Sequence, residues 1–162
     1  MRRIRNIFAA GLLAAAVSGA AIAAEAPVDP YVMSDANAGA APIRGERVYK
    51  AFHGLEGITR IVRRLDRFHT EDPRLAEFFK AADHERLQRT LTEQFCYLLG
   101  GPCHYSGRDM KALHTDMGVQ ISTLNAQIED LQKAMDEEHV PVWAQNKLLA
   151  RLAPLERVIV TR

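Results

Sequence analysis

The sequence predicts an all-α fold in a single domain. A chain of 162 residues has the length of one domain. Apolar residues recur at three- and four-residue steps in several segments, which is the spacing of one helix face, and no useful stretch alternates with the period of a strand. The formal net charge of +1 lacks the basic excess of a general nucleic-acid-binding protein, so we expect no nucleic-acid partner.

Residues 1–23 have the pattern of a secretory signal peptide. Three arginines within the first five residues precede an uncharged apolar run, and Ala21 and Ala23 are small residues at the positions that a signal peptidase reads. The run is short for a membrane anchor, which needs ~20 residues. We therefore expect cleavage after Ala23 or Ala24, a periplasmic or secreted protein, and no stable membrane insertion once the signal is removed.

Residues 24–45 are predicted to form a flexible linker. They contain Pro27, Pro30 and Pro42 among several Gly, Ala, Asn and Asp residues, and they show no apolar period. Such a composition favours an irregular backbone. We therefore expect the folded domain to span residues 46–162.

The first half of this domain predicts two long amphipathic helices. One spans residues 54–69, and Asp72-Pro73 ends its helical spacing. The other begins after Asp83, whose side chain can cap it, and ends at the turn Gly100-Gly101. We expect its apolar face to consist of Leu87, Leu91, Phe95, Leu98 and Leu99.

The second half predicts two further long helices. Ser122 can cap the first of them, and Pro141 suits the first turn of the second, which Pro154 should bend or shorten. The side chains that we expect to face inward are Ile121, Leu124, Ile128, Leu131, Met135, Trp143, Leu148, Leu152, Leu155 and Ile159.

A short helix between the two halves carries His114. Ser106 and Asp109 resemble a capping box for a helix that runs through Met117. Spacing alone does not assign His114 as a ligand, because a lone histidine on an apolar helix face is more often part of a core. The other histidines are expected to be exposed or capping: His53, His69, His84, His104 and His139.

The sequence around His114 resembles a known signature. Residues 100–114 read Gly-Gly-Pro-Cys-His-Tyr-Ser-Gly-Arg-Asp-Met-Lys-Ala-Leu-His, which is similar to the segment of group 1 truncated haemoglobins that leads to the proximal haem histidine. The Gly-Gly-Pro-Cys turn resembles that of one subset of the family. The upstream run Asp72-Pro73-Arg74-Leu75-x-x-Phe78-Phe79 and the later Val140-Pro141 are also similar to that family.

This resemblance implies a two-over-two helical globin that binds haem b, with His114 as the iron ligand. No Cys-x-x-Cys-His motif is present in the sequence, so we expect the haem to be non-covalent. Some of the apolar residues at the site can also be plain core. The residues that we expect to contact the haem are Phe78, Phe79, Leu87, Leu91, Tyr105, Met110, His114, Met117 and Ile121.

The distal side departs from the family pattern. Many relatives carry a Phe-Tyr pair where this chain has Leu65-Asp66, and polar residues where it has Leu87, Thr90 and Leu91. We therefore expect an apolar pocket that holds oxygen weakly, with Thr90 as one weak donor. Asp66 is expected to point to solvent; if it faces the haem instead, burial would raise its pKa and let the neutral acid donate.

Cys96 and Cys103 can form a disulfide in an oxidising compartment. The two glycines between them allow the chain to reverse and bring the cysteines within bridging distance. The alternative is a buried Cys96 beside an unpaired Cys103.

The function that these observations favour is reversible binding of a diatomic gas, namely oxygen, carbon monoxide or nitric oxide. Nitric-oxide or peroxide chemistry with a reductase or electron donor as partner would make the protein an enzyme. One alternative is a periplasmic electron-transfer or redox-sensing haem protein that uses Cys96 and Cys103. Another is a haemless helical interaction domain.

Overall fold

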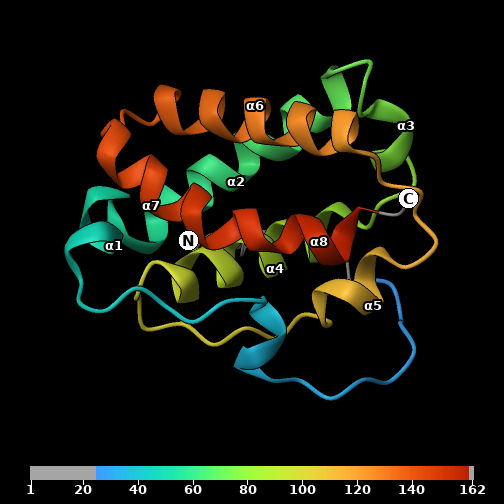
Figure 1. Cartoon of the computed structure of the whole chain (residues 1–162), viewed down its shortest axis with the longest axis horizontal. Helices are drawn as coiled ribbons and strands as arrows, with labels where there is room; N and C mark the ends of the chain where they lie inside the picture. The colour runs from blue at the N-terminus through green and yellow to red at the C-terminus, as the bar shows by residue number, and fades with distance from the viewer. Residues whose placement is uncertain (1–24, 161–162) are drawn as a thin grey trace, which may run out of the picture.

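The computed structural model describes residues 25–160, and this part of the chain contains helices and no strands (Figure 1). The predicted signal peptide therefore lies outside the described residues. No helix in residues 25–160 is long and apolar enough to cross a membrane. The α-helices are α1 (Arg47–Ala51), α2 (Gly54–Glu71), α3 (Ala76–Phe79), α4 (His84–Leu98), α5 (Met110–His114), α6 (Ile121–Glu137), α7 (Val142–Leu152) and α8 (Glu156–Ile159), and the 3-10 helices are η1 (Asp35–Ala38) and η2 (Ala153–Leu155).

The long helices form two layers. In Figure 1, α6 and the run from α7 to α8 lie in front of α2 and α4. Helix α2 packs against both α4 and α6, and α7 also contacts α4. The core between the layers is built from the apolar faces that the helical spacing predicts. Its buried members include Ile58, Ile61, Val62, Leu65, Phe95, Leu98, Leu131, Met135 and Leu148.

Most helix boundaries follow from local capping chemistry. Asp83 caps α4 as expected, because its carboxylate accepts a hydrogen bond from the backbone N–H of Arg86 at 3.1 Å. Pro154 shortens α7, which ends at Leu152 and continues as η2. A helix that ends before proline avoids the clash of the pyrrolidine ring with the preceding turn.

Several local expectations are wrong. Ser106 does not cap α5, because its hydroxyl and N–H bond to the Glu93 carboxylate instead. Ser122 lies inside α6, which begins at Ile121 without a side-chain cap. Trp143 is exposed rather than inward, and the Arg47 guanidinium lies over its ring at 4.9 Å. Ile121 is likewise exposed rather than inward.

The segment expected to be a flexible linker makes specific contacts with the helical domain. Ala38 is completely buried, and its carbonyl accepts a hydrogen bond from Gln94 Nε2 at 2.9 Å. The Ile43 N–H donates to the Leu98 carbonyl at 2.8 Å. Gly39 has φ +86°, and a Cβ there would collide with the Leu155 side chain. A composition typical of irregular backbone therefore does not prevent this segment from packing.

A buried carboxylate joins the start of α2 to the end of α6. Glu138 accepts hydrogen bonds from Arg60 Nη2 and Arg64 Nη1, each at 2.6 Å, and lies 3.3 Å from His53 Nδ1. Mainly because of the hydrogen bond from Arg60, the pKa of Glu138 is lowered to about 2. The two arginines pair the negative charge of Glu138, whose burial would otherwise cost free energy.

Candidate functional site

Helix α5 is a short, firmly capped helix that ends at His114. The Asp109 carboxylate accepts hydrogen bonds from the backbone N–H groups of Lys111 and Ala112 at 3.0 and 3.1 Å, which satisfies the start of the helix. The main helical contact of α5 is with α8. His114 is therefore the last residue of a helix whose start is capped and which packs on α8.

The His114 ring is oriented as a metal ligand requires. Its Nδ1 donates a hydrogen bond to the Met110 carbonyl at 2.7 Å, so Nε2 is the nitrogen left to accept a proton or bind a metal. Within residues 25–160, Nε2 has no hydrogen-bond partner. The side chain is half-buried, and this burial lowers the pKa of His114 below its usual value. A neutral imidazole with one free nitrogen fits the axial ligand of a haem.

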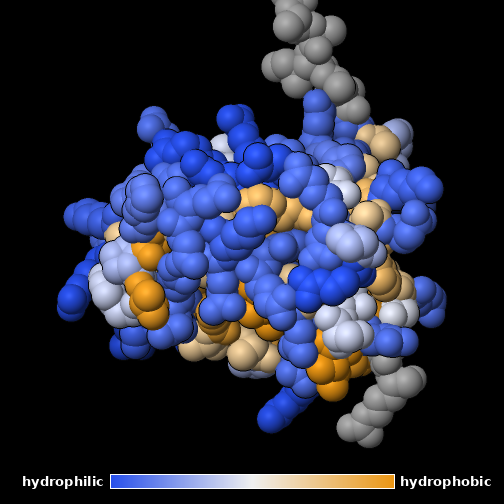
Figure 2. Space-filling model, turned by 90° about the horizontal axis from the view of Figure 1, so that it is seen from above, coloured by the Kyte–Doolittle hydropathy of each residue, from blue (hydrophilic) through white to orange (hydrophobic). Residues whose placement is uncertain are grey.

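Large apolar side chains surround this end of the molecule. Figure 1 shows α3, α5 and the first turn of α6 at the same end. Phe78, Leu113, Met117 and Ile121, which lie on or next to these elements, are between 36% and 55% exposed. The face in Figure 2 also shows apolar patches between hydrophilic side chains. Exposed apolar side chains at the end of the molecule that carries His114 are compatible with a flat apolar ligand.

Several other residues that were predicted to contact the haem make contacts within the protein. Tyr105 is buried, and its hydroxyl donates to the Arg108 carbonyl at 3.2 Å. Met110 is also buried, and Gln94 Nε2 lies 3.4 Å from its sulfur. Phe79 stacks on His69 with ring centroids 4.2 Å apart. Leu87 and Leu91 remain half-buried on α4.

His69 was expected to be exposed or capping, and this expectation is wrong. Its side chain is 4% exposed, and neither ring nitrogen has a hydrogen-bond partner among the described residues. Burial lowers the pKa of His69 to about 4, so the ring is neutral at pH 7. The spacing of His69 from Val62 and Leu65 on the buried face of α2 is a signal that could have identified it.

Asp66 was expected to point to solvent, and it is instead buried between α2 and α4. One carboxylate oxygen lies 2.8 Å from His84 Nδ1, and the other accepts from Gln88 Nε2 at 2.6 Å. His84 and Gln88 are four residues apart and therefore share a face of α4. Both oxygens are thus used as acceptors, and no donor toward a ligand is added here.

The hydroxyl of Thr90 also forms a hydrogen bond within the protein. It donates to the Arg86 carbonyl at 2.9 Å, which is the usual contact of a threonine inside a helix. Thr90 is therefore not the weak distal donor that the sequence suggested. The half-buried side chains of α4 beside it, Leu87 and Leu91, have no polar atoms.

A disulfide joins Cys96 to Cys103, with a Cα–Cα separation of 5.8 Å. The turn between them needs Gly100, because it has φ +81° and a Cβ there would collide with the Ile43 carbonyl. The bridge ties the end of α4 to the segment that leads to α5. Of the alternatives left open by the sequence, the bridged form is the one observed.

Replacing both Cys96 and Cys103 with serine should destabilise the protein by ~2–3 kcal/mol, the chain-entropy value for so short a loop. Urea unfolding of the oxidised wild type and of the double variant measures this difference. Thiol counting on the denatured wild type should find no free thiol. Two free thiols, or equal unfolding midpoints, would contradict the prediction.

Two layers of helices, with a half-buried histidine on a short capped helix, define a globin of the shortened, two-over-two type. The chain belongs to the bacterial-like globin family, whose family model matches residues 47–161. Membership of this family implies a haem-binding globin. The prediction of an all-α truncated globin fold is confirmed.

Individual relatives agree with this assignment. The chain is 28% identical over 114 residues to a group 1 truncated haemoglobin of Mycolicibacterium paratuberculosis, covering 70% of this chain and 84% of the relative. It is 36% identical over 66 residues to a group 1 truncated haemoglobin of Tetrahymena pyriformis, covering 41% of this chain and 54% of the relative. The crystal structure of the truncated haemoglobin from Tetrahymena pyriformis in the Fe(III) form has a TM-score of 0.68 at 25% identity, covering 71% of this chain and 98% of that one.

Proposed function

We propose that this protein reversibly binds a diatomic gas at the iron of a non-covalent haem b, and that His114 Nε2 is the proximal ligand. The observation that carries the proposal is the His114 ring itself. The ring is half-buried, its Nδ1 donates to the Met110 carbonyl, and its Nε2 has no hydrogen-bond partner among the residues that the structure describes. The haem supplies the iron that binds the gas.

The chain supplies the environment of that iron. The hydrogen bond from Nδ1 to the Met110 carbonyl selects the tautomer that presents a lone pair on Nε2, and it raises the basicity of the ligand. Burial disfavours the imidazolium that would otherwise compete with the metal. The Asp109 cap limits movement of α5.

We also propose that the protein is exported, on the basis of the signal pattern in residues 1–23. Mass spectrometry of the protein recovered from the periplasm should show a chain that begins at Ala24 or Glu25. Recovery of the full-length chain in the cytoplasm alone would contradict export. Haem and gas binding can be tested independently of this result.

Absorption spectra of the purified protein test the main proposal. The ferric, ferrous and carbon monoxide forms should each show a Soret band, and haem titration should saturate at one equivalent. A protein that takes up no haem would instead be a helical interaction domain. Measured gas affinities and the reduction potential then separate gas binding from electron transfer.

We expect the distal pocket to hold oxygen weakly. The side chains of Leu87 and Leu91 have no hydrogen-bond donor. The side chains of Asp66 and Thr90 form hydrogen bonds within the protein. A missing charge-assisted hydrogen bond is worth roughly 1.5–3 kcal/mol, or about one to two decades in affinity. Stopped-flow measurements should therefore show oxygen release that is fast compared with tyrosine-bearing relatives.

A new donor on α4 should slow that release. Leu91→Gln introduces an amide next to the ligand position, and one added hydrogen bond should slow oxygen dissociation by about tenfold. Leu91→Met keeps a similar volume without a donor and is the matched control. Equal rates in both variants would show that Leu91 does not face the bound gas.

A further inference from the structure

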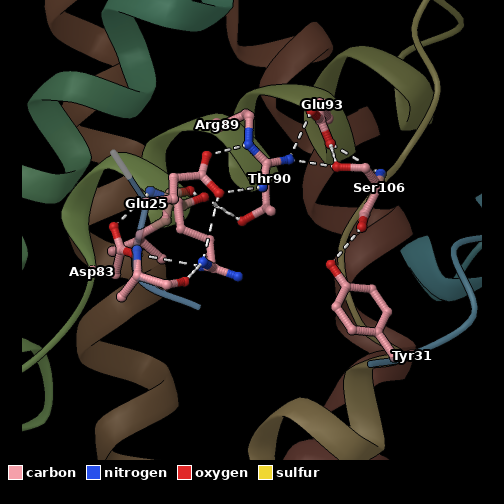
Figure 3. Close-up of polar contacts among 10 residues, drawn as sticks. Glu25, Tyr31, Asp83, Arg89, Thr90, Glu93 and Ser106 are labelled. Carbon is pink, nitrogen blue, oxygen red and sulfur yellow. Dashed lines mark hydrogen bonds and ion pairs between the residues drawn. The ribbon is translucent and has the colours of Figure 1, made fainter. Parts of the chain in front are cut away.

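The N-terminal residues 25–31 bridge α4 and the segment that leads to α5. They contact the first half of α4 at one end and residues 106–108, which lead to α5, at the other. Figure 3 shows the contacts of Glu25 with Arg89, and those of Glu93 and Tyr31 with Ser106. If haem binds between α4 and His114, as proposed above, this bridge spans the edge of that site.

Arg89 on α4 is the centre of the contact. Its Nη2 donates to Glu25 Oε2 at 2.8 Å, and its Nε donates to Glu25 Oε1, so the carboxylate is held at two points. Arg86 also lies 3.7 Å from the same carboxylate and donates to the Ala26 carbonyl. At the start of α4, the Ala26 N–H donates to Asp83 at 2.7 Å.

Arg89 also reaches the segment that precedes α5. It donates to Ser106 Oγ, and to Glu93 Oε1 at 3.1 Å. The other oxygen of Glu93 accepts from the Ser106 N–H at 2.9 Å and from its hydroxyl at 2.6 Å. A single guanidinium therefore joins the N-terminal segment, α4 and the approach to α5.

The far end of the bridge is held by two further contacts. The Tyr31 hydroxyl donates to the Ser106 carbonyl at 2.8 Å. Arg108 donates to the Asp29 carbonyl at 3.1 Å, and its guanidinium lies over the Tyr31 ring at 5.4 Å. These contacts attach the bridge to residues 106–108, which precede the helix that carries His114.

We propose that residues 25–31 form a latch that holds α4 and the α5 segment together and thereby sets how fast haem leaves. The Cys96–Cys103 disulfide joins the same two segments by a covalent bond, so it acts as the hinge end. The latch end consists of ion pairs and hydrogen bonds that are partly exposed to solvent. Such contacts break and re-form easily, so the latch end is where the site opens.

Haem transfer to an excess of a high-affinity apoglobin scavenger tests the latch. Glu25→Gln removes the charge but leaves Arg89 paired with Glu93, so the fold is preserved. Partly exposed ion pairs of this kind are worth ~0.2–1 kcal/mol, so haem loss should become about 1.4- to fivefold faster. Added salt should accelerate haem loss from the wild type more than from the variant, because the ion pair is screened.

The control is Glu46→Gln, which removes an exposed ion pair to Lys50 on α1, and which should leave haem loss unchanged. A second readout uses the haem-free protein. Hydrogen exchange at the Ser106 amide should be faster in Glu25→Gln than in the wild type, because the Arg89–Glu93–Ser106 contacts loosen.

The outcomes separate this proposal from the proposed function. A wild type that binds haem but loses it at the same rate as Glu25→Gln overturns the latch and leaves haem binding intact. A wild type that binds no haem overturns both the haem site and the role of the latch in haem release. In that case, faster exchange at Ser106 in the variant would still identify the contact as a structural tie.

Discussion

Replacing His114 with alanine should lower haem affinity by more than about 100-fold, since loss of a group that merely orients a metal ligand already costs about 10–100-fold. The variant removes His114 Nε2, which has no hydrogen-bond partner within residues 25–160 and belongs to a half-buried side chain. Haem titration followed by absorption spectroscopy measures the affinity. Any haem that remains should lack the spectrum of an axial imidazole, and added free imidazole should restore it.

His104→Ala is the matched control for this experiment. His104 lies ten residues earlier in the same segment, is 92% exposed and contacts Asp35 at 3.0 Å. Its removal should leave the haem spectrum unchanged. Spectra of His114→Ala that match the wild type would contradict the proximal assignment.

Replacing Glu138 with glutamine should destabilise the protein by about 1–2 kcal/mol at pH 7. The folded pKa of about 2 lies well below the usual value of 4.5, so the charged carboxylate stabilises the folded state. The full pKa shift would correspond to a larger loss of stability. However, the side chains of Arg60 and Arg64 are 46% and 30% exposed, and solvent screens their attraction to Glu138. Urea unfolding measures the free energy of unfolding of each variant.

The pH dependence has a defined sign. Because the folded pKa is depressed, the stabilisation from Glu138 is fully present above about pH 4.5 and is lost as the pH falls toward 2. The wild type should therefore lose more stability than Glu138→Gln over this range. The control is Glu137→Gln, because Glu137 is 42% exposed and its arginine contacts are 3.4 and 3.7 Å long. Parallel pH profiles for the wild type and Glu138→Gln would contradict the prediction.

Local patterns were sufficient for the main helices, and the resemblance of residues 100–114 to a family signature identified His114 as the candidate ligand. The spacing over residues 54–69 predicts α2 because one side of a helix must be apolar to pack. Asp83 and Gly100 mark the ends of α4 through chemistry that involves only their nearest neighbours. The motif around His114 predicted a short capped helix, but Asp109 rather than Ser106 caps it, and it ends at His114 rather than at Met117.

The sequence by itself determined the all-α class, the main helices and the identity of His114 as the candidate ligand. Tertiary structure alone decided that residues 25–43 pack on the domain, that Asp66 is paired and that His69 is buried. Periodicity reports which side of a helix is apolar, but it does not report which distant group meets a polar side chain. Glu25 and Arg89 are 64 residues apart, and Arg60 and Glu138 are 78 apart, so only the folded chain brings their charges together.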